Sequence, residues 1–237
     1  MSNPEETPEK DWWDFVDPAK IASSLDALID AAPEEVTIPD AEPAGRPVQM
    51  KGWDARHRHL SDPTGEKWLE TFGLAKAVVK GTGLLALIGD RGTGKTQMAS
   101  HIAADGQWPN DVGKWNGHRN VFDQTAQYVR AMDIFLDLRD ANRKGSETSE
   151  KVVLAKLADV GLLVIDEFQE RGESEWENRV LTNLIDKRYA AMRPTIIIAN
   201  YDRAQLSSAL SPSIKDRMHE NGKSFMFDWP SYRRAAK

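Results

Sequence analysis

The residues with the clearest chemical meaning in this sequence are eight consecutive positions that read Gly-Asp-Arg-Gly-Thr-Gly-Lys-Thr. They fit the phosphate-binding pattern G-x-x-x-x-G-K-[ST] at every fixed position. In such a loop, backbone N–H groups converge on phosphate oxygens at the positive end of a helix dipole. The predicted nucleotide-binding residues are Gly89, Asp90, Arg91, Gly92, Thr93, Gly94, Lys95 and Thr96.

The segments on either side of this loop match what the pattern requires. An apolar run at 83–88 has the length of a strand, and 97–104 can continue as a helix. We therefore expect Lys95 to reach the β and γ phosphates of ATP, and the Thr96 hydroxyl to ligate Mg²⁺. The alternative is an ordinary glycine-rich turn. This interpretation is weaker, because a strand before the loop and a helix after it are both expected.

A second set of polar residues follows two later apolar strands. Asp166 and Glu167 come directly after 162–165, and Asn200 comes after 195–199. Ligands of open α/β sheets bind at the carboxyl ends of the strands. Asp166 is expected to hold Mg²⁺, directly or through water, while Glu167 orients the water that attacks the γ phosphate. Asn200 can position the same water, although an Asn at a strand end also forms local turns.

Arg217 is a further candidate, on a helix predicted after the last core strand. An arginine can stabilise the charge of phosphoryl transfer from a neighbouring subunit. The alternative is an ion pair within the chain, with Asp216 or Glu220. The local sequence does not separate these two interpretations.

The elements that must position these residues are strands alternating with helices, which predicts an α/β fold with a parallel sheet covered on both faces. A helical pattern lies within 53–80, and 106–120 is rich in Gly, Pro and Asn and predicts a loop. The expected strands are 83–88, 126–129, 162–165 and 195–199, and the expected later helices are 97–104, 132–142, 150–157 and 175–192.

Composition limits the classes of protein that this chain can belong to. It has 237 residues and no cysteine, which excludes disulfides and cysteine zinc sites. No apolar run approaches the roughly 18 residues of a membrane span, so we expect no membrane partner and a cytoplasmic location. Residues 1–45 carry twelve acidic side chains against two lysines, a charge of −10, which leaves +4 for the rest of the total of −6. A basic body is compatible with nucleic acid.

The acidic N-terminal part is predicted to be a separate arm. Residues 1–50 are expected to be partly disordered, with a short amphipathic helix at 18–30 and a Pro-rich linker, and 51–237 to form the main domain. The helix is preceded by three aromatic residues, Trp12, Trp13 and Phe15. These either pack on the body or become ordered on a partner protein.

Several motifs together resemble the AAA+ helicase loaders of the DnaC type, over about residues 70–234. Besides the phosphate loop, the strand ending in Asp-Glu and Asn200, they are Asn-Leu-Ile-Asp-Lys-Arg at 183–188, Arg-Pro-Thr at 193–195, Asp-Arg-Met at 216–218 and Phe-Asp-Trp-Pro-Ser-Tyr-Arg at 227–233. The tail and the Asp-Arg-Met element are more discriminating than the nucleotide motifs, which many ATPases share. The long 106–120 loop and the acidic arm depart from the bacterial pattern, and a phage or mobile-element version of the loader would accommodate both differences.

This resemblance implies an AAA+ P-loop core and an ATPase that hydrolyses ATP to ADP and phosphate. It implies binding to a replicative hexameric helicase through the N-terminal segment, which here includes Trp12, Trp13, Phe15 and the helix at 18–30. It also implies delivery of that helicase onto single-stranded DNA in DNA replication, by a homo-oligomer assembled on the helicase ring. In that family the arginine of Asp-Arg-Met acts on a neighbour's ATP, which favours Arg217, and Asn200 matches the polar sensor.

Contacts to single-stranded DNA are predicted between the two nucleotide motifs. Basic side chains would neutralise phosphates, and an aromatic side chain would stack on a base. A solvated helix is an equal alternative, because aspartates are interleaved with the positive charges. The candidate residues are Tyr128, Arg130, Arg139, Arg143 and Lys144.

Three other functions remain open at this point. A transposition-regulating ATPase of the IstB type shares the same core and differs in its partner, a transposase. A P-loop kinase for a small metabolite would need a lid and an acceptor pocket, and it leaves Asn200 and Arg217 unexplained. The third is an ATP-binding interaction protein that scarcely hydrolyses ATP.

Overall fold

The computed structural model describes residues 49–54, 57, 65–106, 114–115, 118–119 and 125–232. They belong to one compact unit, Arg46–Lys237. The aromatic residues and the helix predicted for the arm lie outside the described residues. The sheet begins at Gln49, just inside the range predicted for the arm.

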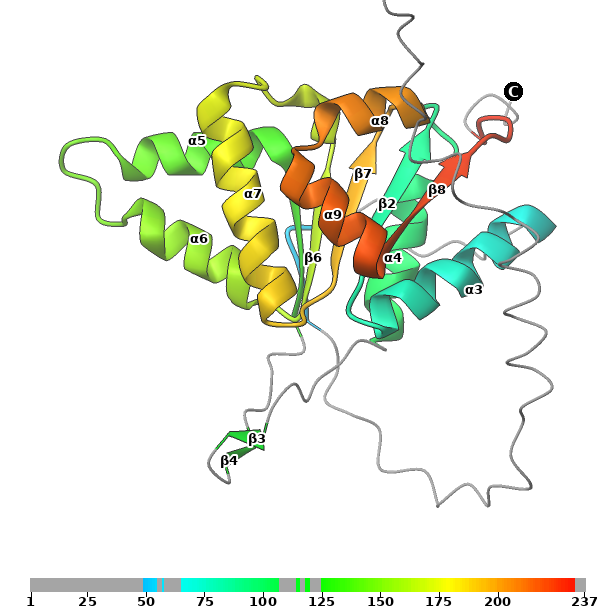
Figure 1. Ribbon diagram of the computed structural model, residues 1–237, viewed down its shortest axis with the longest axis horizontal. Coiled ribbons are helices and arrows are strands. Elements are labelled where there is room, and N and C mark those ends of the chain that lie inside the picture. The colour runs from blue at the N-terminus through cyan, green and yellow to red at the C-terminus, as the bar shows by residue number, and fades with distance from the viewer. Residues whose placement is uncertain are drawn as a thin grey trace, which may run out of the picture. The chain divides into compact units, whose positions relative to one another are not determined.

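The core is a six-stranded parallel sheet in the order β1-β5-β6-β7-β2-β8 (Figure 1). Its strands are β1 (Gln49–Lys51), β2 (Leu84–Gly89), β5 (Thr125–Arg130), β6 (Leu162–Asp166), β7 (Thr195–Ala199) and β8 (Gly222–Phe227). The three central strands β6, β7 and β2 are buried along their whole length, which explains their continuous apolar sequences. The predicted α/β fold with a parallel sheet is confirmed.

Helices cover both faces of this sheet. In Figure 1, α7 and α9 lie in front of the sheet and α4 lies behind it. Alternation along β2 directs Leu85 and Leu87 into the core cluster that contains Met98 and Ile102 of α4. The helices are α3 (Glu66–Lys80), α4 (Lys95–Asp105), α5 (Ala131–Ala141), α6 (Glu150–Asp159), α7 (Glu175–Ala190), α8 (Arg203–Ala209) and α9 (Pro212–Asn221), with a 3₁₀ turn, η2 (Phe168–Glu170).

Short polar side chains set where the later helices begin. Ser149, Ser174, Asp202 and Ser211 each accept a hydrogen bond from a backbone N–H in the first turn of the helix that follows. At α7 the cap is reciprocal, because Glu177 also accepts from the Ser174 N–H. This cap fixes the residue at which α7 begins, shortly after η2 in the sequence.

Some elements differ from the sequence-based expectation. The edge strands β1 and β8, the helix α8 and the turn η2 were not predicted. The expected loop 106–120 contains a two-stranded antiparallel hairpin, β3 (Lys114–Trp115) and β4 (His118–Arg119). In α3, which lies within the helical pattern expected at 53–80, the apolar side chains of Leu69 and Leu74 are exposed, with exposed fractions of 48% and 40%. Among the described residues, no helix has the length and apolar character needed to cross a membrane.

Candidate nucleotide-binding site

The phosphate-binding pattern forms the turn between β2 and α4, at the carboxyl edge of the sheet (Figure 1). Gly89 has φ +125° and Gly94 has φ +90°, in the region that favours glycine. A Cβ atom at Gly89 would lie 2.5 Å from the carbonyl oxygen of Phe227. Both fixed glycines therefore suit their positive φ, and at Gly89 the close approach of β8 also leaves no room for a side chain.

Lys95 is the first residue of α4 and is buried, with an exposed fraction of 5%. Its Nζ donates to the carbonyl oxygens of Gly89 and Asp90, at 2.7 and 2.6 Å. The Thr93 hydroxyl donates to the same Asp90 oxygen, at 2.8 Å. The ammonium group therefore lies inside the curve of the loop, where the pattern predicts that phosphate oxygens bind.

Thr96 belongs to the phosphate loop and Asp166 ends β6, and their side chains meet at the carboxyl edge of the sheet. The Thr96 hydroxyl donates to Asp166 Oδ2 at 2.8 Å, and the Asp166 side chain is almost fully buried. A hydroxyl and a carboxylate are oxygen donors of the kind that Mg²⁺ prefers. The donor set therefore fits the predicted magnesium site, with Thr96 and Asp166 as the residues that would hold the ion.

Tyr128 on β5 completes the hydrogen bonding of Asp166. Its hydroxyl donates to the same Oδ2 at 3.0 Å, while Asp166 Oδ1 accepts from the Glu167 N–H at 2.6 Å. Burial raises the pKa of Tyr128, and the charge of Asp166 raises this pKa further, so the phenol stays a donor. Tyr128 is only 7% exposed and packs on Trp53, with ring centroids 4.8 Å apart. The structure therefore does not support stacking of Tyr128 on a DNA base.

Glu167 has an unusual backbone for a non-glycine residue, with φ +50° and ψ +43°. Such left-handed residues are sparsely populated and cluster at functional sites. The turn that follows is held by Arg171, which donates to the carbonyl oxygens of Phe168 and Ala209 and stacks 4.0 Å from the Phe168 ring. The Glu167 carboxylate itself is half-exposed and lies 4.0 Å from Arg130 Nε.

Asn200 leaves β7 at the same edge of the sheet. The register pairs Ala199 with Ile88, so Asn200 lies level with the start of the phosphate loop. Its N–H donates to Gln169 Oε1 at 3.0 Å, and Gln169 belongs to the turn after Glu167. The structure thus brings Lys95, Thr96, Asp166, Glu167 and Asn200 to one edge, as their positions after the strands predicted.

Arg217 lies away from these residues, near the amino ends of the strands. It lines a small cavity with Gly83 and Thr195, which stand at the starts of β2 and β7. Its Nε is 3.6 Å from Asp186 Oδ1, and its guanidinium lies 4.7 Å from the Tyr189 ring. The partner in this ion pair is Asp186, and not Asp216 or Glu220, which the alternative interpretation of the sequence had named. Within one chain, Arg217 therefore does not reach the phosphate loop.

Two of the other basic candidates for DNA contact form ion pairs with carboxylates. Arg139 pairs with the buried Glu177 at 3.2 Å, and Arg143 pairs with Asp140 at 3.1 Å. Lys144 is exposed. These pairs give Arg139 and Arg143 a role within the domain, on the surface of α5 and in the turn after it.

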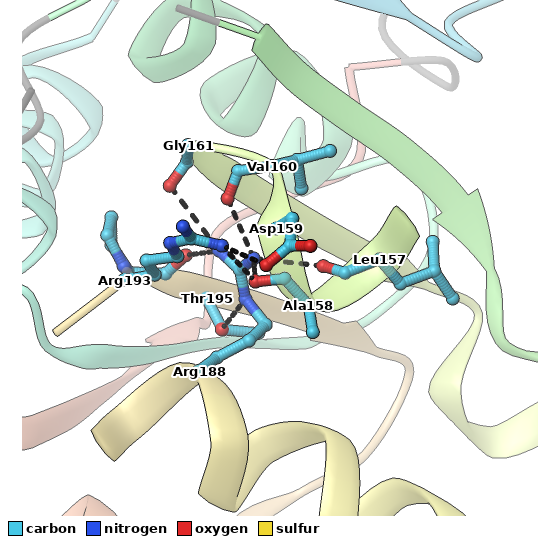
Figure 2. A network of polar contacts seen from close by, with 9 residues as sticks. Leu157, Ala158, Asp159, Val160, Gly161, Arg188, Arg193 and Thr195 are labelled. Carbon is cyan, nitrogen blue, oxygen red and sulfur yellow. Dashed lines mark hydrogen bonds and ion pairs between the residues drawn. The ribbon is translucent and has the colours of Figure 1, made fainter. Parts of the chain in front are cut away.

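The sequence interpretation missed a polar network that surrounds Arg188 (Figure 2). This fully buried side chain of α7 donates to six acceptors at 2.6 to 3.4 Å, and all of them lie near the starts of β6 and β7. The available signal was its place in the motif at 183–188, which had been used only as a mark of the family. The acceptors are Thr195 Oγ1 and the carbonyl oxygens of Leu157, Ala158, Val160, Gly161 and Pro194.

The parallel sheet, the phosphate loop and the Thr96–Asp166 pair define a P-loop nucleotide-binding protein. Residues 73–237 match the family model described as IstB-like ATP binding protein. The chain belongs to this family of IstB-like ATP-binding proteins.

Its relatives include helicase loaders, in agreement with the predicted resemblance. The replicative helicase loader DnaC of Escherichia coli strain K12 is 30% identical over 146 residues, which are 61% of this chain and 54% of that protein. DnaC of Buchnera aphidicola subsp. Acyrthosiphon pisum is 27% identical over 150 residues, 63% of this chain and 56% of that protein. The matched part thus spans little more than half the length of these relatives.

Solved structures show the same fold at lower identity. A crystal structure of the DnaC helicase loader superposes with a TM-score of 0.54 at 18% identity, covering 73% of this chain and 99% of that chain. A crystal structure of DnaI gives 0.56 at 18% identity, covering 78% and 96%. These similarities support the AAA+ P-loop fold.

Proposed function

We propose that this protein is an ATPase that binds a replicative hexameric helicase and helps deliver it onto single-stranded DNA. The observation that carries the proposal is the contact between Thr96 and Asp166 beside the buried Lys95, in an IstB-like ATP-binding chain related to DnaC loaders. This constellation is the one that P-loop ATPases use for ATP with Mg²⁺.

In this proposal, the chemistry belongs to the carboxyl edge of the sheet. Glu167 orients and polarises the water that attacks the γ phosphate, and the Asn200 amide helps to position this water without adding charge. Lys95 binds the β and γ phosphates. The bound Mg²⁺ supplies neutralisation of phosphate charge. The hydrogen bonds that Asp166 accepts from Thr96 and Tyr128 keep its carboxylate in place.

Arg217 acts on the ATP of a neighbouring subunit. Support comes from its place near the far edge of the sheet and from its partial exposure, which leaves it accessible to a second chain. Because one chain supplies Lys95 and its neighbour supplies Arg217, the site is complete only in an oligomer.

A mixing experiment tests this arrangement. Lys95→Ala and Arg217→Ala are each expected to lose ATP hydrolysis, while the mixture regains part of it, since mixed pairs contain one intact composite site. Phosphate release should be measured with the helicase present. Wild-type hydrolysis by Arg217→Ala alone would contradict the role of Arg217.

Helicase binding is assigned to the acidic arm, through Trp12, Trp13, Phe15 and the helix at 18–30. The test is capture of the purified hexameric helicase of the same host by the full chain, by a chain lacking residues 1–32, and by Trp12→Ala/Trp13→Ala. We expect capture by the full chain only. Equal capture by all three would show that the arm is not the binding element.

The specific alternative is regulation of a transposase, which the IstB-like family match favours. The two functions differ in the partner. Binding to a purified transposase of the same host, with no binding to its helicase, would select the alternative.

A further inference from the structure

The C-terminal segment after β8 lies directly on the phosphate loop. Two of its groups donate hydrogen bonds to loop carbonyl oxygens: Trp229 Nε1 to Thr93 at 2.9 Å, and the Tyr232 N–H to Gly92 at 2.9 Å. A Cβ atom at Gly94 would lie only 3.4 Å from the Tyr232 ring. The segment therefore contacts three consecutive residues of the loop.

This contact has a firm base in the sheet. Edge strand β8 pairs with β2 as far as Phe227, which is opposite Gly89. The Phe227 side chain is buried, and the Trp229 ring packs against it with centroids 4.6 Å apart. The position of the indole N–H is thereby set by the core of the protein.

The two hydrogen bonds determine the direction of the loop N–H groups. In a planar trans peptide, the C=O of one residue and the N–H of the next point in opposite directions. With the Gly92 and Thr93 carbonyls turned toward the C-terminal segment, the N–H groups of Thr93 and Gly94 point away from it. Those two N–H groups belong to the stretch that cradles phosphate in this kind of loop.

We infer that residues 227–232 form a strap that orients the phosphate loop for ATP, with Trp229 and Tyr232 as positioning residues. The inference rests on the proposed binding of ATP by this loop. The strap fixes the orientation of two peptide groups before the nucleotide arrives, so less ordering remains to be done on binding. Its loss weakens ATP binding, and hydrolysis at saturating ATP is retained, because the two hydrogen bonds of the strap reach Thr93 and Gly92 and not the residues assigned to the chemistry.

The decisive variant is Trp229→Phe, which keeps an aromatic ring on Phe227 and removes the N–H donor. The matched control is Trp176→Phe, since Trp176 is also partly buried but lies on α7 against Phe135, at 5.8 Å between centroids. The Kd of ATP with Mg²⁺ is measured by isothermal titration calorimetry. Loss of one hydrogen bond predicts a Kd about fivefold higher for Trp229→Phe, and no change for Trp176→Phe.

A second pair tests the backbone donor. Tyr232→Pro removes the N–H that donates to the Gly92 carbonyl oxygen, whereas Tyr232→Ala keeps this N–H. Tyr232→Pro should therefore bind ATP more weakly than Tyr232→Ala. Amide hydrogen exchange at 92–94 should be faster in Trp229→Phe than in Trp176→Phe. If Trp229→Phe and Trp176→Phe have the same Kd and the same exchange, the strap is wrong. If the wild-type protein itself fails to bind ATP, the proposed function fails instead.

Discussion

A buried cation lies at each end of the strands of the parallel sheet, Arg188 at the amino ends and Lys95 at the carboxyl ends. The two differ in the hydrogen bonds that they donate. Arg188, at the starts of β6 and β7, has six fixed acceptors around its guanidinium (Figure 2). Lys95, at the carboxyl edge, donates to two carbonyl oxygens of the glycine-rich loop to which it belongs. Burial is common to both, so burial alone does not identify the residue that binds a ligand.

The difference follows from the shapes of the two groups. A guanidinium is a planar fork whose donors match a rigid set of acceptors, whereas an ammonium is a compact charge that can exchange its partners. Burial lowers the pKa of Arg188 to about 9, and the charge of Arg193 acts in the same direction. This pKa still lies above neutrality, so Arg188 stays charged and joins α7 to the loops before β6 and β7. Lys95 is the cation suited to a ligand.

The first prediction concerns the structural cation and has the largest expected effect. Arg188→Met should lower the free energy of unfolding by about 3–5 kcal/mol, because six buried or partly buried acceptors lose a charged donor. Urea unfolding measures the change. Lys187→Met is the matched control, since Lys187 is exposed on the same helix and should change stability by less than about 0.5 kcal/mol. Equal stability of the two variants would contradict the structural role of Arg188.

The second prediction concerns the carboxyl edge, where a substitution should change the rate of ATP hydrolysis and leave the free energy of unfolding unchanged. Glu167→Gln should lower ATP hydrolysis about 100-fold, because the amide cannot polarise the attacking water, while the Kd of ATP changes by less than about threefold. Phosphate release and calorimetry measure the two quantities. Glu170→Gln, in the next turn, is the control and should hydrolyse ATP normally. Unchanged turnover in Glu167→Gln would remove Glu167 from the mechanism.

The contrast between the two edges also explains what the sequence could predict. The central strands 84–89, 162–166 and 195–199 were found because burial on both faces requires continuous apolar sequences. Polar residues directly after such strands must meet at one edge, which placed Asp166 and Asn200 beside the loop. Edge strand β8 was missed because it is only partly buried and contains Lys223 and Ser224, so it lacks an apolar run.

Contacts between residues far apart in the sequence could not be predicted. Arg188 continues the buried stripe of α7 after Leu184 and Ile185, but an arginine is rarely buried without a partner. Nothing local shows that carbonyl groups from Leu157 to Gly161, about 30 residues earlier in the sequence, surround it. For Arg217, an ion pair with Asp216 or Glu220 was the alternative interpretation, whereas the packing of α9 on α7 supplies Asp186 as the partner. The burial of Tyr128 against Asp166 likewise depends on the pairing of β5 with β6.

The third prediction tests this last contact. Tyr128→Phe keeps the packing on Trp53 and removes the hydroxyl that donates to Asp166. We expect a loss of about 1 kcal/mol in the free energy of unfolding and about a fivefold rise in the Mg²⁺ concentration needed for half-maximal ATP binding. A metal titration by calorimetry measures the rise. A loss of stability with an unchanged Mg²⁺ requirement would make Tyr128 a structural residue only.

The smallest effect is expected at a third cation, Arg91, which belongs to the phosphate loop but points a solvent-exposed side chain at Glu170, at 3.1 Å. Exposed ion pairs contribute little, so Arg91→Ala should change the free energy of unfolding by less than about 1 kcal/mol. The Kd of ATP should change by less than about twofold, because the loop binds phosphate through backbone N–H groups and Lys95, and residue 91 keeps its N–H. Calorimetry on Arg91→Ala and Lys95→Ala side by side measures the contrast. A large loss of ATP binding in Arg91→Ala would mean that an exposed arginine also binds the nucleotide, and that burial within the loop is not what distinguishes Lys95.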